Sequence, residues 1–202
     1  MANETSEISK VSEAEFASLA FTPFEHQKEA IEYGISKKKW LNLFSMGLGK
    51  TCTLIGQAEI LRKRGLIDHC LIICGVDSLR QQWAKECRKF SHESALVLGE
   101  RRTKSGKLFY APVAERAKQL MEPIDEFFVI TNISSLRDGK LVEAFKKSKN
   151  KFGLICLDEA HRVATKSSQQ GSNLLKLTAE YKVAMSGSLV TNSPLSCYVP
   201  LV

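Results

Sequence analysis

The sequence predicts an α/β domain with a mostly parallel β-sheet flanked by helices. Several apolar runs of strand length do not alternate with polar residues, which is typical of strands covered on both faces. Stretches of helical periodicity separate these runs, so we expect parallel strands with the helices between them. The length of 202 residues suits one such domain with its own core and is short for two.

The first long helix is expected in the stretch TPFEHQKEAIEYGI. Before it, residues 1–20 are expected to form a loosely ordered arm that carries one short helix. Thr22 should cap the long helix, with Pro23 at its first position and Glu25 completing a capping box. Gln27 falls on the apolar stripe of this helix. Its amide should therefore point inward, where it needs hydrogen-bond partners.

The remaining elements alternate between strands and helices. A short strand in WLNLF precedes a helix from Lys50 to Arg64, which Gly65 ends. The strand HCLIICG precedes a helix that Ser78 should cap, with Gln81 in the box position. Further strands are expected in ALVLG, FFVIT, FGLICLD and YKVAMSG. In doubly wound sheets of this kind, ligands bind outside the carboxyl ends of the strands.

Composition and charge limit the class of protein. With 44% hydrophobic and 25% charged residues, the chain is ordinary for a folded protein rather than for a disordered or fibrous one. No apolar run approaches the ~18 residues of a membrane span, and the polar, acidic start differs from a signal peptide, so an intracellular location is expected. The six cysteines form no CxxC pair, which predicts reduced thiols and no structural zinc.

The net charge of +7 and the pI of about 9.1 favour a polyanionic partner, above all nucleic acid. Any single basic run could instead be solvated surface. One run, GERRTKSGK from Gly99 to Lys107, contains a Gly-Lys pair with the wrong spacing for a phosphate loop. We therefore expect it to be a mobile basic loop.

The stretch FSMGLGKT lies between a predicted strand and a predicted helix. In that setting the backbone N–H groups of residues 46–51 form a cradle at a helix N-terminus, where polyphosphate is stabilised. Gly47 and Gly49 allow close approach, Lys50 can reach the β- and γ-phosphates, and the Thr51 hydroxyl can bind Mg²⁺. The pattern predicts ATP and Mg²⁺ as ligands. A plain strand-to-helix turn is the alternative.

The stretch LICLDEAH delivers two acids to the carboxyl edge of a predicted strand. Asp158 can hold Mg²⁺ through water, and Glu159 can orient or deprotonate an attacking water. Asp158 could instead cap a helix. A phosphate loop requires an acidic partner for its metal ion, so the two stretches together favour the nucleotide site.

Six segments stand in the order of the Q motif and motifs I, Ia, Ib, II and III of superfamily 2 helicases. They are Gln27, MGLGKT, SLRQQW, VITNISSLR, DEAH and SGSLVTN. The chain most resembles the Swi/Snf-type helicase-like ATPases, which also lack the first glycine of motif I, where Phe44 stands here. This resemblance spans about residues 20 to 195. It implies the first RecA-like lobe, a three-layer P-loop domain, over residues 21–202, with the second lobe absent.

The resemblance also implies roles for the matched residues. Catalysis would depend on Lys50, Asp158 and Glu159. The residues that would bind ATP are Gln27, Met46, Gly47, Leu48, Gly49, Lys50, Thr51 and Cys52, with Gln27 at the adenine edge. Thr51 and Asp158 would bind the metal ion. His161, Ser186 and Ser188 would couple the nucleotide to the second lobe. Ser78, Thr131 and Arg137 would meet the nucleic-acid backbone.

Each of these residues also has an ordinary structural interpretation. Gln27 could bond only to backbone groups, and His161 could cap a helix. Ser186 and Ser188 could belong to a Ser-Gly turn. Ser78, Thr131 and Arg137 could be a helix cap and surface side chains.

The predicted function is the ATP-binding lobe of a nucleic-acid-dependent ATPase of the helicase or translocase type, with DNA favoured over RNA. A second RecA-like lobe, which supplies arginines to the transition state in this family, is expected as a partner in cis or in trans. Without it, the lobe should hydrolyse ATP very slowly. The alternatives are a small P-loop kinase, against which the DEAH segment and the lack of an arginine-rich lid count, and a non-catalytic module that binds nucleic acid or another partner.

Overall fold

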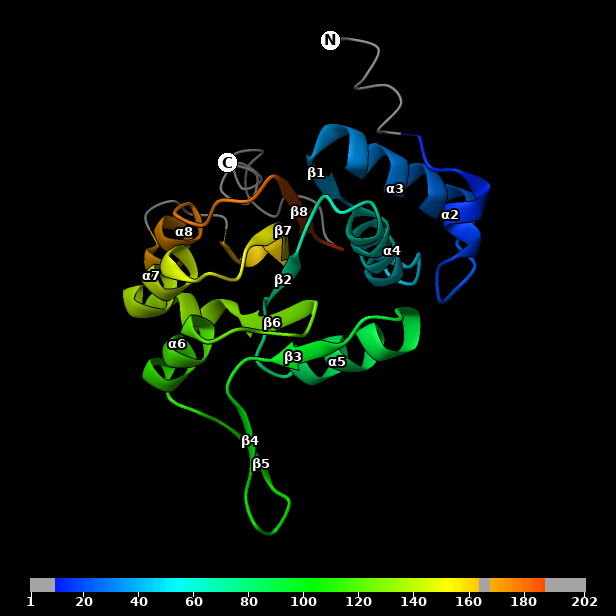
Figure 1. Ribbon diagram of the computed structural model, residues 1–202. Coiled ribbons are helices and arrows are strands. Elements are labelled where there is room, and N and C mark those ends of the chain that lie inside the picture. The colour runs from blue at the N-terminus through cyan, green and yellow to red at the C-terminus, as the bar shows by residue number, and fades with distance from the viewer. Residues whose placement is uncertain (1–9, 164–167, 188–202) are drawn as a thin grey trace.

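The computed structural model describes residues 10–163 and 168–187, and their main feature is a six-stranded parallel sheet (Figure 1). Its strand order is β1-β8-β7-β2-β6-β3. The strands are β1 (Lys39–Asn42), β2 (His69–Cys74), β3 (Ala95–Val97), β6 (Phe128–Asn132), β7 (Phe152–Leu157) and β8 (Tyr181–Met185). All neighbouring pairs run parallel, so the predicted α/β fold class is confirmed.

Helices cover both faces of the sheet. They are α2 (Glu13–Ala17), α3 (Glu25–Lys37), α4 (Lys50–Lys63), α5 (Leu79–Phe90), α6 (Val113–Met121), α7 (Gly139–Lys147) and α8 (Gln169–Leu174). Figure 1 shows α3, α4 and α5 on one side of the sheet and α6, α7 and α8 on the other. Two short 3₁₀ helices, η1 (Ile133–Arg137) and η2 (Ala160–Val163), follow strands β6 and β7. Among the described residues, no helix combines the length and the apolar character that a membrane span requires.

The sheet separates the core into two clusters, one on each face, and strand β2 contributes side chains to both. Cys70 and Ile72 pack into the cluster that contains the helix residue Leu54, whereas Leu71 and Ile73 pack into the cluster on the other face. All of these side chains are at most 1% exposed. This alternation across a strand covered on both sides explains why β2 is a continuous apolar run in the sequence.

One predicted helix cap is wrong, and a second lacks the expected side-chain hydrogen bond. Helix α3 begins at Glu25 with Phe24 as its N-cap, so neither Thr22 nor Pro23 belongs to the cap. The reason is that Gln27 reaches back: its Oε1 accepts a hydrogen bond from the Phe24 backbone N–H at 3.1 Å. At α5, Ser78 is the N-cap residue as predicted, but it has helical backbone angles and its side chain makes no cap hydrogen bond.

The stretch predicted as a mobile basic loop forms a hairpin instead. Strands β4 (Glu100–Arg102) and β5 (Leu108–Tyr110) pair antiparallel, and the hairpin protrudes from the body of the domain (Figure 1). The Thr103 N–H donates to the Lys107 carbonyl at 2.9 Å, and Gly106 takes a φ of +82° that favours glycine. Each strand has only three residues, and β4 consists of charged residues alone, so periodicity did not reveal them.

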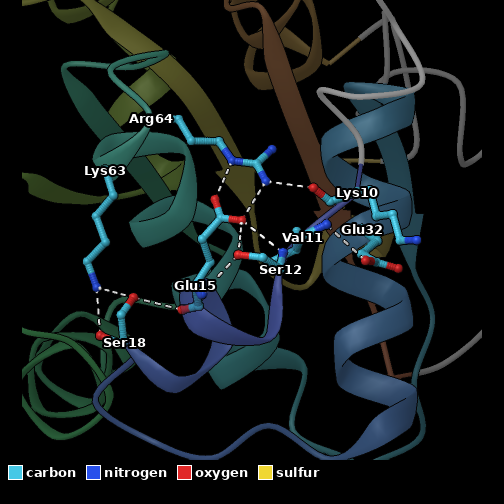
Figure 2. Close-up of polar contacts among 8 residues, drawn as sticks. All are labelled: Lys10, Val11, Ser12, Glu15, Ser18, Glu32, Lys63 and Arg64. Atoms are coloured by element: carbon cyan, nitrogen blue, oxygen red, sulfur yellow. Dashed lines mark hydrogen bonds and ion pairs between the residues drawn. The ribbon is translucent and has the colours of Figure 1, made fainter. Parts of the chain in front are cut away.

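The described part of the N-terminal arm packs against the domain. Val11, Phe16 and Leu19 are buried in the core that α3 and α4 share. Figure 2 shows the polar contacts that accompany this packing. The Arg64 guanidinium donates to both carboxylate oxygens of Glu15 at 2.6 and 3.0 Å, and the Lys63 ammonium donates to the Ser18 carbonyl at 2.7 Å. The arm is therefore tied to the C-terminal end of α4.

The ion pair between Glu15 and Arg64 should contribute to stability. The hydrogen bond from Arg64 lowers the pKa of Glu15 from 4.5 to about 2. Because the folded-state pKa is depressed, the stabilisation is complete above about pH 4.5 and is lost as the pH falls toward 2. Since the pair is partly exposed and screened, Glu15→Gln is expected to lower the free energy of unfolding at pH 7 by about 1–2 kcal/mol.

Urea unfolding at several pH values between 7 and 3 would measure this effect. Glu13→Gln is a matched control on the same helix, because Glu13 pairs with Lys28 while its side chain is 83% exposed. We expect the control to keep wild-type stability. An equal loss in both variants would contradict the assignment of this stabilisation to the Glu15–Arg64 pair.

Candidate nucleotide-binding site

The predicted site residues meet at one edge of the sheet because strands β1, β8 and β7 are neighbours. The glycine-rich loop follows β1, Ser186 follows β8, and Asp158 follows β7. The register pairs Asn42 with Met185, at the ends of β1 and β8. A Cβ added to Gly187 would lie 3.5 Å from the Lys50 ammonium. Segments more than 100 residues apart in the sequence therefore form one site.

The loop needs its two glycines for conformational reasons. Gly47 has a φ of +84° and Gly49 a φ of +81°, both in the left-handed region that favours glycine. Gly49 is also the N-cap of α4. A Cβ there would lie 2.3 Å from the Gln27 side-chain nitrogen and 2.8 Å from the Cys52 sulfur. Backbone strain and lack of space thus both require glycine at position 49.

The Lys50 side chain folds back onto the loop that precedes it. Its ammonium donates hydrogen bonds to the carbonyls of Phe44, at 2.8 Å, and Ser45, at 3.3 Å. These contacts hold a positive charge beside the start of α4, where a helix N-terminus stabilises anions. Phosphate oxygens would be stronger partners for this ammonium than neutral carbonyls, because such hydrogen bonds are charge-assisted.

Gln27 is buried with 4% of its surface exposed, as its place on the helix stripe predicts. Its carbonyl oxygen accepts from the Phe24 N–H, and its amide nitrogen donates to the Leu48 carbonyl at 3.2 Å. The His26 ring nitrogen lies 3.2 Å from the same Leu48 oxygen. In this structure Gln27 therefore joins the start of α3 to the phosphate loop through backbone groups, and its reading of adenine stays a prediction.

Asp158 is fixed by two hydrogen bonds. The indole N–H of Trp83 donates to one carboxylate oxygen at 2.8 Å, and the Glu159 backbone N–H donates to the other at 2.9 Å. Burial raises the pKa of Asp158, while the Trp83 hydrogen bond and the charge of Lys50 lower it. A desolvated carboxylate that also senses the Lys50 charge is suited to face a cation.

Two residues near the acidic pair were missed as site residues. Trp83 is one of them, since nothing in the sequence indicates that its N–H would find Asp158 as its acceptor. Gly75, at the end of β2, lies against the acidic turn: a Cβ on it would be 2.5 Å from the Cβ of Glu159. Glu159 itself has a φ of +53°, unusual for a residue other than glycine.

His161 connects the acidic turn to strand β8. Its Nδ1 lies 3.1 Å from the Ser186 hydroxyl and 3.3 Å from a Glu159 carboxylate oxygen. The Ser186 N–H donates to the Asn42 carbonyl at 3.2 Å, beside the start of the phosphate loop. His161 and Ser186, two of the three predicted coupling residues, are thus in contact. The third, Ser188, lies outside the described residues.

Comparison with known proteins identifies the family. The model of the family described as "Type III restriction enzyme, res subunit" matches residues 20–189. The chain belongs to this family. The prediction of a helicase-like ATPase lobe is confirmed, and the alternative of a small P-loop kinase is wrong.

Relatives and solved structures agree with this assignment. The chain is 23% identical over 178 residues to the human "DNA excision repair protein ERCC-6-like", covering 84% of this chain and 13% of the relative. It is 25% identical over 170 residues to "ATP-dependent helicase FUN30" of Saccharomyces cerevisiae, covering 76% and 14%. The structure resembles the Sulfolobus solfataricus SWI2/SNF2 ATPase core in complex with dsDNA, with a TM-score of 0.71 and 18% identity, over 91% of this chain and 36% of that one.

These similarities show the RecA-like α/β fold that is also found in the SWI2/SNF2 ATPase core, and they support the assignment to a helicase-like lobe of the Swi/Snf type. The chain spans only 11% to 15% of the length of the curated relatives it matches. A cavity of about 240 Å³ elsewhere in this helicase-like lobe is lined by residues that include Leu71, Phe145 and Ile155, and none of the predicted site residues lines it.

The three residues predicted to meet nucleic acid lie on or after the carboxyl ends of β2 and β6, at the same edge of the sheet as the predicted nucleotide site. Ser78 and Arg137 are exposed, whereas Thr131 is 1% exposed. The Thr131 hydroxyl is buried without a hydrogen-bond partner in the part of the chain that the structure describes. As placed here it cannot touch a nucleic-acid strand, so its predicted contact would require a rearrangement.

Proposed function

We propose that this lobe binds ATP with Mg²⁺ and, together with a second RecA-like lobe, couples ATP hydrolysis to movement along DNA. The observation that carries the proposal is that Lys50, after β1, and Asp158, after β7, lie at the carboxyl ends of the two strands that flank β8, where the Lys50 ammonium is one of the charges that act on Asp158. An ammonium and a carboxylate at the same edge of the sheet, beside a helix N-terminus, suit a metal-bound polyphosphate.

The residues present fit Mg²⁺ as well as ATP. No group of three or more His, Cys, Asp or Glu side chains that could hold a metal ion occurs among the described residues. Mg²⁺ is bound typically through one or two protein oxygens together with phosphates and water, for which Thr51 and Asp158 would suffice. When bound, the ion would neutralise charge on the phosphates.

The other side chains have defined tasks in this proposal. Lys50 would exchange its two carbonyl partners for phosphate oxygens. Glu159, with a third of its side chain exposed, would orient the attacking water or accept its proton. The contact between His161 and Ser186 would couple changes at the bound nucleotide to the position of the second lobe. Ser78 and Arg137 would hold the nucleic-acid backbone without reading sequence.

Several finer points belong to the same proposal. The sheet fold, the family and the structural similarity to a SWI2/SNF2 ATPase core in complex with dsDNA support a nucleic-acid partner, with DNA favoured over RNA. Residues 21–202 would form the ATP-binding lobe, with residues 1–20 as its arm. An intracellular location is proposed. The remaining alternative is a non-catalytic module that keeps the fold and binds nucleic acid or another partner.

Nucleotide titrations with and without Mg²⁺ test the proposal. Binding of a non-hydrolysable ATP analogue to the wild-type chain should tighten when Mg²⁺ is added. Asp158→Asn is expected to remove most of this gain, weakening Mg²⁺ binding by about 10- to 100-fold, while binding without metal stays unchanged. The Trp83 indole should report the metal through its fluorescence, because it donates to Asp158.

Asp125→Asn is a matched control at an exposed position before β6. It should behave like the wild type in both titrations. The proposal fails if the wild-type chain does not bind the analogue, or if Asp158→Asn keeps the full effect of Mg²⁺.

A further inference from the structure

The β4–β5 hairpin carries an exposed positive charge that the nucleotide site does not use. Residues 101–107 are all exposed, and the basic side chains here are Arg101, Arg102, Lys104 and Lys107. The one acid of the hairpin, Glu100, is engaged by Arg102 at 3.7 Å and by the Gln81 amide at 3.0 Å. Among the described residues, Lys104 and Lys107 form no ion pair.

The base of the hairpin is held firmly on helix α5. The Arg80 guanidinium lies 3.5 Å from the centre of the Tyr110 ring, and the Gln81 amide donates to the Tyr110 hydroxyl at 3.0 Å. The Ala111 N–H donates to the Gly99 carbonyl at 2.8 Å, which closes the base. The protruding strands of Figure 1 are therefore an ordered extension of α5, whose first turn follows Ser78.

The two faces of the hairpin differ because side chains alternate along a strand. Tyr110 faces α5, so Phe109 and its cross-strand partner Arg101 share the opposite face. Phe109 is 45% exposed, which is unusual for an aromatic side chain on a charged hairpin. An aromatic ring across from a guanidinium, in a hairpin that also carries two exposed lysines, combines a stacking platform for a base with contacts for phosphates.

From this arrangement we infer that the β4–β5 hairpin binds single-stranded DNA, with Phe109 stacking on an unpaired base and the basic side chains meeting the adjacent phosphates. The inference deepens the proposed function, since it rests on nucleic acid as the partner of this lobe. It extends the proposed contact surface from Ser78 along α5 to the hairpin. A duplex would offer phosphates to the same charges but no free base face to Phe109.

Binding of fluorescent oligonucleotides to the 202-residue chain tests this inference. Phe109→Ala is expected to weaken binding of single-stranded DNA by at least about fivefold, because stacking on an aromatic side chain is worth that much per base. Phe109→Trp should keep the affinity, and Phe109→Leu should lose it although it keeps an apolar side chain. Binding of duplex DNA of the same sequence should not change in any of the three variants.

The charges are tested by the dependence of binding on salt. The triple variant Arg101→Gln, Lys104→Gln, Lys107→Gln should reduce the slope of log affinity against log salt for single-stranded DNA by about 2, since each phosphate contact contributes about 0.7. The matched control removes three exposed lysines from the segment that precedes β7, at the amino end of that strand: Lys147→Gln, Lys149→Gln and Lys151→Gln. It should keep the wild-type slope.

The outcomes separate this inference from the proposed function. If the wild-type chain binds the ATP analogue but no nucleic acid, the proposed partner fails and the hairpin site with it. If the wild-type chain binds DNA and the hairpin variants bind it equally well, only the hairpin inference fails. An equal loss for duplex DNA in Phe109→Ala, an effect confined to RNA, or an equal change of slope in the control triple would also overturn it.

Discussion

Lys50→Ala is expected to lower ATP turnover of the assembled motor by about 10²- to 10³-fold, the effect of removing one preorganised charge from a transition state. The same change should weaken nucleotide binding to the isolated lobe. Lys50 is the cation that the structure holds between the loop carbonyls of Phe44 and Ser45. Alanine keeps the backbone N–H groups of the loop in place, so the loss reports the ammonium itself.

Calorimetric titration with ATP and steady-state hydrolysis would measure the two effects. Lys39→Ala is a suitable control, because Lys39 is exposed at the far end of β1 and makes no contact with the loop. Thermal unfolding should show both variants folded. If Lys50→Ala leaves nucleotide binding intact, or if the biological effect of the protein survives the change untouched, the non-catalytic module is the better interpretation.

The conformation of the glycine-rich loop and the position of the acidic pair could be predicted from sequence because each depends on local residues. Gly47 and Gly49 adopt backbone angles that few other residues tolerate, and the apolar run of β7 must end where Asp158 begins. The order of the neighbouring strands then places these segments together. The parallel sheet was equally predictable, since uninterrupted apolar runs need cover on both faces.

Contacts between distant segments could not be predicted in the same way. Trp83 and Asp158 are 75 residues apart, and the sequence shows that each is placed by its own element but not that the two meet. The role of Tyr110 in holding the hairpin on α5 is a similar case. Thr131 shows a further limit, because a motif match gives the position of a residue in the chain but not its burial.

Local caps were mispredicted for a related reason. Thr22, Pro23 and Glu25 fit a capping box by residue type, yet Gln27 satisfies the N-terminal amide of α3 at Phe24 instead. A side chain that bonds both to Phe24 and to the Leu48 carbonyl gains two partners at once. Tertiary contacts of this kind override a local preference that is worth only about 1 kcal/mol.

Adding the second RecA-like lobe in trans is expected to raise ATP turnover of this lobe by about 10³- to 10⁵-fold, the contribution of an arginine finger in related phosphoryl-transfer sites. The outer side of the phosphate loop is open: Met46 is 85% exposed and Leu48 46% exposed. An exposed apolar side chain beside a charged nucleotide site is suited to be covered by another domain. The contact between His161 and Ser186 lies at the same edge, where it can respond to closure.

The measurement is steady-state hydrolysis of the isolated lobe, of the second lobe from a family member, and of their mixture, each with and without DNA at one salt concentration. Substituting the arginines of the second lobe by alanine should return the ATP turnover of the mixture to the rate of the isolated lobe. Lys50→Ala in this lobe should lower the turnover of the mixture in the same way. Brisk DNA-stimulated turnover by this lobe alone would show that its own residues complete the catalytic site. The mixture could also bind ATP and DNA without faster turnover. That result would mean that the two lobes close only when they are covalently connected, because the connection raises the effective concentration of the second lobe.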